Sequence, residues 1–268
     1  MDQPIRLSVE EFACAMALCG RNEAAMAYLL STLPGTSADA FNEIMTCASH
    51  GLIAQGYLEV APDLGYGPLR ADLRGVAELA SGDAVTLRCH KAGSVSGQPT
   101  EEFESLTFGP DRVTVHWTEK RVVAVLAALP SHAEAFSYIT GFVGATEDNP
   151  AAASGAAPSR LPAAAIGALR KAIADGRAVD AEAILKQHRS APWTNDFLRC
   201  LADPAAVWGD ILRLDRNADG ITAERGLLFV TAAPISWLLA QDPEHEDHLL
   251  VIPATGQRLT EILAELTR

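Results

Sequence analysis

The stretch LRLDRNADGIT has the residue types and the spacing with which a calcium-binding EF-hand loop begins. Asp215, Asn217 and Asp219 occupy alternate positions, and Gly220 follows where such a loop turns. The loop also needs a helix on each side and a bidentate carboxylate at its twelfth position, which here is Gly226. Asp, Asn and Gly equally suit a β-hairpin turn, because they tolerate left-handed backbone conformations. The preceding AVWGDILRL can be interpreted as helix or strand, but the following GLLFV is typical of a strand, so we predict a turn without metal.

A second group of possible metal ligands lies in the segment DPEHEDHLL, where His245 and His248 stand among carboxylates. Neighbouring residues on a loop rarely converge on one ion without a further ligand from elsewhere in the chain. We therefore interpret this segment as a polar loop between the strand-like segments SWLLA and LLVI. The other histidines are scattered, and we expect neither a metal nor a cofactor.

The motifs of common enzyme classes are missing from the sequence. There is no G-x-S-x-G nucleophile elbow, since GSVSG at 93–97 has its serines in the wrong register, and there is no P-loop or H-E-x-x-H. GYGPLR at 65–70 lacks the third glycine of a dinucleotide-binding fingerprint. We predict a protein that is not an enzyme, the alternative being an active site built from dispersed residues.

The composition restricts the classes of partner and the compartment. A formal net charge of -13 over 268 residues opposes binding to the phosphate backbone of nucleic acids and to anionic membranes. The 5 cysteines form no C-x-x-C pair and indicate buried thiols in a reducing compartment. The sequence shows no signal peptide and no apolar stretch of membrane-spanning length, so we expect a cytoplasmic protein.

The positions of helices and strands follow from the hydrophobic periodicity. The S-x-x-E pattern at Ser8 predicts a capped helix, and helical patterns continue to about residue 80. DAVTLRCH, DRVTVHW and RVVAVLAAL then predict strands, and a helix follows Pro130. Within the first part, NEIMTCASHGLIAQGYLEV resembles the recognition helix and first wing strand of winged-helix proteins. Its candidate recognition residues Asn42, Thr46 and His50 stand beside Glu43 on an acidic background, which favours protein contact over DNA.

The same succession of patterns occurs twice along the chain. Residues 144–160 are rich in Ala, Gly, Ser and Pro and predict a flexible linker. Helices, a strand meander and a closing helix then recur, with matched apolar anchors such as Leu79 and Leu201 at offsets of 121 to 123 residues. We predict an α+β fold of two similar halves, 1–143 and 161–268, related by a quasi-two-fold axis, with a winged-helix-like start.

Several segments together resemble the EspG family, the cytoplasmic chaperones of type VII (ESX) secretion. They are LSVEEFACAMALCG, HGLIAQGYL, AVLAALP, LPAAAIGAL and the closing LLVIPATGQRLTEIL, so the resemblance spans most of the chain. The family's D-T-x-x-G-R-Y pattern is absent, and GLLFVTAAPISWLLA stands in its place. The resemblance implies two similar halves, each a sheet with helices. It also implies a non-enzymatic chaperone that holds the apolar tip of a secreted PE–PPE-type helical hairpin.

The partner-binding residues that we predict lie after the linker. Trp193 and Phe197 stand four residues apart and can share one helix face beside the sheet of the second half. An exposed aromatic pair would suit the apolar end of a helical partner. Burial of Trp193 in the core is the alternative. A winged-helix-derived regulatory or protein-interaction module is the competing function.

Overall fold

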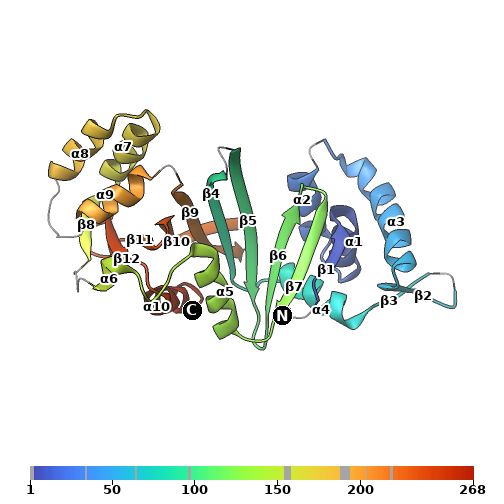
Figure 1. Cartoon of the computed structure of the whole chain (residues 1–268). Helices are drawn as coiled ribbons and strands as arrows, with labels where there is room; N and C mark the ends of the chain where they lie inside the picture. Colours follow the sequence, from blue (N-terminus) through green and yellow to red (C-terminus); the bar gives the residue numbers. More distant parts are fainter. Residues whose placement is uncertain are drawn as a thin grey trace. The chain divides into compact units, whose positions relative to one another are not determined.

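The structure is a computed structural model that describes residues 3–33, 35–63, 65–95, 98–153, 158–187, 194–203, 205–217 and 220–268 (Figure 1). Its helices and antiparallel strand meanders confirm the predicted α+β class. The chain forms two compact units. Unit 1 comprises Met1–Thr86, Glu104–His132 and Asp215–Thr222, and unit 2 comprises Leu87–Phe103, Ala133–Leu214 and Ala223–Arg268.

Unit 1 contains the first helices and the strands that follow them. Its elements are β1 (Ile5–Ser8), α1 (Val9–Leu18), α2 (Asn22–Thr32), α3 (Ala38–Ala54), β2 (Leu58–Val60), β3 (Tyr66–Leu69), α4 (Ala71–Ala80), β6 (Val113–Glu119) and β7 (Val123–Leu129). The hairpin of β4 (Thr86–Val95) and β5 (Gln98–Phe108) has residues in both units. The strand order in this unit is β1-β7-β6-β5, and each neighbouring pair is antiparallel.

The predicted capping box starts α1. The hydroxyl of Ser8 accepts a hydrogen bond from the N–H of Glu11 at 3.1 Å, and the Glu11 carboxylate accepts one from the N–H of Ser8 at 2.8 Å. α1 packs against α2, α3, α4 and β7, which makes it the centre of the core of unit 1. α3 is followed directly by the antiparallel hairpin β2–β3, which is the order of a helix and a wing, and the winged-helix-like start stays a prediction.

Unit 2 contains all or most of each of the remaining elements. They are α5 (His132–Val143), α6 (Pro150–Ala153), β8 (Ser159–Pro162), α7 (Ala163–Ala174), α8 (Ala178–Gln187), α9 (Thr194–Ala202), β9 (Val207–Asn217), β10 (Gly220–Ala232), β11 (Ile235–Gln241), β12 (His248–Pro253) and α10 (Gly256–Leu266). The strand order is β4-β9-β10-β11-β12-β8. No helix in the described part of the chain combines the length and the apolar character that crossing a membrane requires.

Both faces of the strand meander in unit 2 carry apolar side chains, because successive residues of these strands are apolar and point to alternate faces. Trp237, Leu239 and Val251 point to the face that α7, α8 and α9 cover. The intervening Leu238 pairs with Ile252 and belongs to the opposite face, beside α10. Helices thus lie on both faces of these strands, α7 to α9 on one face and α10 on the other.

The order of elements from β1 to α5 is similar to the order from β8 to α10. Each series has a short strand, a group of helices, four strands and one helix, and the first series also contains the hairpin β2–β3. In each series the first strand pairs antiparallel with the last of the four, β1 with β7 and β8 with β12. The two-fold axis between the halves stays a prediction.

Part of the segment that we expected to be a flexible linker is packed. Asn149 is 1% exposed, and its Nδ2 donates to the carbonyls of Ser236 at 2.7 Å and Ala254 at 2.9 Å. Residues 150–153 form α6, and β8 begins at Ser159. The prediction of mobility does not hold for 144–153, because small side chains that suit a loose linker also allow close packing against strands.

The stretch LRLDRNADGIT, for which we predict a hairpin turn, has a strand on each side. β9 ends at Asn217, β10 begins at Gly220, and the two strands are hydrogen-bonded neighbours. The helices that flank an EF-hand loop are therefore replaced by strands. Residues 218 and 219 lie outside the described residues.

Candidate functional site

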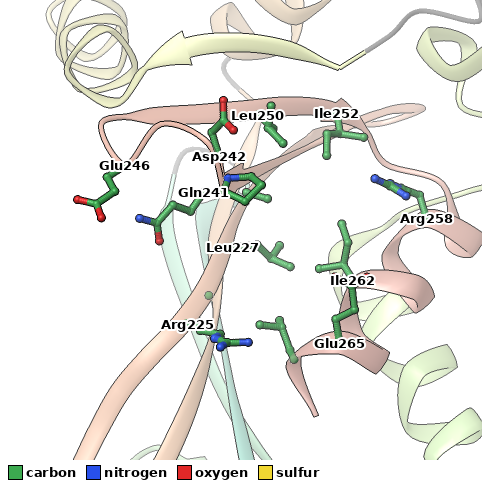
Figure 2. A pocket seen from close by; sticks show the side chains of 14 residues that line it. Arg225, Leu227, Gln241, Asp242, Glu246, Leu250, Ile252, Arg258, Ile262 and Glu265 are labelled. Atoms are coloured by element: carbon green, nitrogen blue, oxygen red, sulfur yellow. The ribbon is translucent and has the colours of Figure 1, made fainter. Parts of the chain in front are cut away.

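A pocket of about 580 Å³ lies in unit 2 between α10 and the strands β10, β11 and β12. Figure 2 shows its lining side chains around one open space. The volume falls in the range of about 300–1,000 Å³ that is usual for ligand sites. The pocket is lined by Arg225, Gly226, Leu227, Ala240, Gln241, Asp242, Pro243, Glu246, Leu250, Ile252, Arg258, Ile262, Glu265 and Leu266.

The strand side of the pocket is apolar because of the register of the strands. Leu227 pairs with Ala240, and Leu250 pairs with the same Ala240 on the other side, so the three side chains share one face. Ile252 lies two residues further along β12 on that face. The side chains of Leu227, Leu250 and Ile252 point into the open space (Figure 2).

The helix side of the pocket comes from the edge of the apolar stripe of α10. Thr255 caps the helix by accepting a hydrogen bond from the N–H of Arg258 at 3.1 Å. Leu259 and Leu263, four residues apart, are fully buried. Ile262 lies beside this stripe, keeps partial exposure and points into the pocket (Figure 2). The helix therefore leaves part of the apolar strand face accessible.

The rim of the pocket carries charges of both signs. Arg225, Arg258, Glu246 and Glu265 are all exposed. Figure 2 shows Arg258 and Glu246 at opposite ends of the pocket. Arg258 donates to Glu261 at 2.9 Å, so its guanidinium is held beside the first turns of α10. An apolar floor with a mixed rim suits an amphipathic partner segment better than a uniformly charged ligand.

One buried carboxylate fixes the turn at the end of the pocket. Asp242 is 2% exposed, and its carboxylate lies 2.6 Å from Nε of Arg160 on β8. The N–H of Glu244 also donates to it at 3.0 Å. These contacts, the N–H of Glu244 above all, lower the pKa of Asp242 below its usual range although burial acts in the opposite direction. Asp242 thus joins the β11–β12 turn to β8 as an ionised group.

No group of three His, Cys, Asp or Glu in the described ranges could hold a metal ion. Burial raises the pKa of the thiols of Cys14 and Cys200 to about 11, so both are protonated and weakly nucleophilic at neutral pH. His245 and His248 lie at the β11–β12 turn, with Nδ1 of His248 2.8 Å from the Asp247 carboxylate.

The structure does not place the predicted aromatic pair at the pocket. Trp193 lies outside the described residues, and its role stays a prediction. Phe197 is fully buried on α9 and packs edge to face on Trp237, with ring centroids 5.5 Å apart. This contact assigns Phe197 to the core, on the face of the strands that α7 to α9 cover. Ile262 is the residue by which the sequence could have indicated the pocket. It makes the apolar stripe of α10 wider than the part that is buried.

Comparison with known proteins gives a structural likeness of high coverage. No protein-family model and no curated protein matches the sequence. Among solved structures, the fold is similar to that of the Mycobacterium tuberculosis type VII secretion system chaperone EspG5, solved in complex with a PE25–PPE41 dimer. The TM-score is 0.62 at 13% identity, over 97% of this chain and 94% of that chain. The resemblance inferred from sequence segments is thus confirmed at the level of the fold.

Proposed function

We propose that this protein is a non-enzymatic chaperone or adaptor of the type VII secretion kind, which binds a helical protein of the PE–PPE type in the cytoplasm. The observation that carries the proposal is the similarity to the fold of EspG5 over 97% of the chain. A fold alone does not fix a function. The chemistry of the pocket adds support, because an apolar strand face is rimmed by charges of both signs, as a surface for an amphipathic partner requires.

We infer that the apolar end of the partner contacts unit 2. The pocket between α10 and β10–β12 offers Ile262 and Leu250, two partly exposed aliphatic side chains that a partner could cover. Helix ends that dock in grooves are held by a few apolar anchors of this kind. The segment that contains Trp193 is the other candidate contact in the same unit.

The similar order of elements from β1 to α5 and from β8 to α10 suggests that the chain arose by duplication of one ancestral segment. If the chain arose in this way, the pocket beside α10 lies in the second of the two repeated series, which runs from β8 to α10. An experimental structure whose residues 79–143 and 201–268 superpose strand by strand supports the duplication. Unrelated strand positions for 85–90 and 207–212 contradict it.

The test is co-expression with a PE–PPE-type pair encoded beside this protein, followed by gel filtration. We expect one peak that contains all three chains. Ile262→Asp should remove the complex, because a carboxylate on the α10 wall would then face the apolar floor. Val179→Asp is the matched control, since Val179 is 80% exposed on α8 in the same unit, and this variant should bind as the wild type does.

The outcomes distinguish the chaperone function itself from the proposed location of the contact at the pocket. If the wild type binds and Ile262→Asp binds equally well, the pocket is not the contact, and Trp193→Ala then tests the segment after the linker. If the wild type binds no PE–PPE-type pair, the chaperone function itself is contradicted. Circular dichroism of each variant shows whether a lost complex reflects lost folding.

A further inference from the structure

A second surface, on unit 1, has the features of a protein-docking site. It is formed by the exposed face of α3 and by the adjoining hairpin β2–β3 (Figure 1). Its exposed residues are Glu43, Thr46, His50, Glu59, Val60 and Tyr66, and we refer to them as the α3–wing surface. The three residues from α3 follow each other at spacings of three and four, so they lie along one stripe of the helix.

The α3–wing surface presents two apolar side chains to solvent. Val60 is 52% exposed and Tyr66 is 50% exposed, and the two are cross-strand partners in the β2–β3 ladder. Large apolar side chains are seldom this exposed in pairs unless a partner covers them. Together they form a small apolar patch at the end of α3.

Tyr66 is held in place before any partner arrives. Its hydroxyl is hydrogen-bonded to the hydroxyl of Ser49 at 2.7 Å, and Ser49, which donates to the carbonyl of Thr46 at 2.8 Å, is fully buried on α3. The hairpin is thereby tied to the helix, and the exposed half of the Tyr66 ring has a fixed orientation. A rigid aromatic side chain loses little conformational entropy on binding, which makes it an efficient anchor.

Acidic residues predominate around this patch, and the nearby Arg70, whose guanidinium stacks on Tyr57, is paired with Asp72. Between Arg21 and Arg70 the sequence contains 5 acidic residues and no lysine or arginine. Glu43 and Glu59 of this stretch are exposed on the α3–wing surface. Such a surface repels the phosphates of nucleic acids, although the helix and wing have the arrangement of a DNA-binding module. It attracts a partner with basic residues.

We propose that the α3–wing surface binds a basic amphipathic helix of a partner protein. The apolar side of that helix covers Val60 and Tyr66, and its lysines or arginines pair with Glu43 and Glu59. This contact lies in unit 1 and is independent of the pocket in unit 2. It would let one chaperone hold its cargo and a second protein through different residues.

The test uses a defined probe, an 18-residue helical peptide with leucines on one face and lysines on the other. Backbone NMR spectra of the isotope-labelled protein are recorded during titration with the peptide. We expect saturable shifts in α3 and β2–β3, which weaken when salt is raised from about 0.05 M to about 0.5 M. The double variant E43K/E59K should weaken binding about tenfold, and Val60→Ser should also weaken it.

Matched controls make the proposal falsifiable. Asp111→Lys makes the same kind of charge reversal at another exposed position of unit 1 and should leave the affinity nearly unchanged. The proposal is overturned if Asp111→Lys weakens binding as much as Glu59→Lys does, because attraction by net charge alone would then explain it. Shifts confined to other elements, no saturation at millimolar peptide, or binding of an 18-base-pair DNA duplex through α3 would each overturn it as well.

Discussion

Acid should destabilise unit 1 through the imidazole of His116. The ring lies on β6 against α1 and α2, with its centroid 5.1 Å from that of Phe12 and its Nε2 3.3 Å from the hydroxyl of Tyr28. Burial lowers the pKa of His116 from 6.5 to about 4, because the enclosed ring is poorly placed to carry a charge. The folded protein therefore holds this histidine in its neutral form over most of the pH range.

The sign and the size of the effect follow from this lowered pKa. The stability contributed by neutral His116 is fully present above pH 6.5, where the unfolded chain is also neutral, and is lost as the pH falls from 6.5 towards about 4. The difference between the two pKa values corresponds to about 3 kcal/mol for a ring cut off from water. Solvent still reaches part of the ring, so we expect a loss of about 1–3 kcal/mol.

The assay is urea denaturation of the wild type and of His116→Gln at several pH values between about 7 and 4. The variant loses packing at every pH, but it lacks the titrating ring, so the difference in stability between the two proteins should shrink as the pH falls. His50→Gln is the control, because His50 is exposed on α3. A difference between wild type and His116→Gln that stays constant over this range would refute the reasoning.

Three further predictions concern packing and thiols. Gly209→Ala should lower the free energy of unfolding by about 1–3 kcal/mol, because a Cβ there would collide with the ring of Phe229 and the carbonyl of His90, whereas Gly167→Ala, with open space around it, should not; equal effects in urea denaturation would contradict this. Asn149→Ala should cost about 2 kcal/mol or more, because the Ser236 and Ala254 carbonyls lose the Nδ2 donor and the N–H of Ala151 loses the Oδ1 acceptor, and a loss below about 0.5 kcal/mol would show that the buried amide is dispensable. In the native protein at pH 8, Ellman's reagent should modify the exposed Cys47 and spare the buried Cys14 and Cys200; rapid reaction of all of them, followed by mass spectrometry, would show that the thiols are accessible.

The sequence predicted those elements whose signal is local. Ser8 and Glu11 form the capping box that their spacing indicates, and β6 and β7 occupy the segments whose alternation or apolar character indicated strands. The order of elements also followed from periodicity, because helices and strands differ in their hydrophobic repeat. The helix and wing at α3 and β2–β3 were visible for the same reason.

The short outer strands could not be predicted in this way. β1 and β8 each span four residues, and in the described ranges they pair with β7 and β12, far away along the chain. A four-residue strand of this kind is stabilised by long-range pairing, which leaves no periodic signal of its own. Ser159 was for that reason assigned to a linker.

The pocket depends on relations that a single sequence does not contain. Its floor requires the register that places Leu227, Ala240 and Leu250 on one face, and its wall requires the orientation of α10 that leaves Ile262 at the edge. For Phe197 the sequence predicted a binding residue where the structure has a buried one. An aromatic residue on a short helix next to a predicted partner site proved to be a core residue against Trp237.

The proposed chaperone function is tested most directly by an equilibrium titration. A purified PE–PPE-type pair from the same gene neighbourhood is titrated with this protein and the heat of binding is recorded. We predict saturation at one copy of this protein per pair, with a Kd of about 1 μM or tighter, as expected for a specific interface of standard size. The absence of saturable binding at about 100 μM protein, with both components folded, would contradict the account.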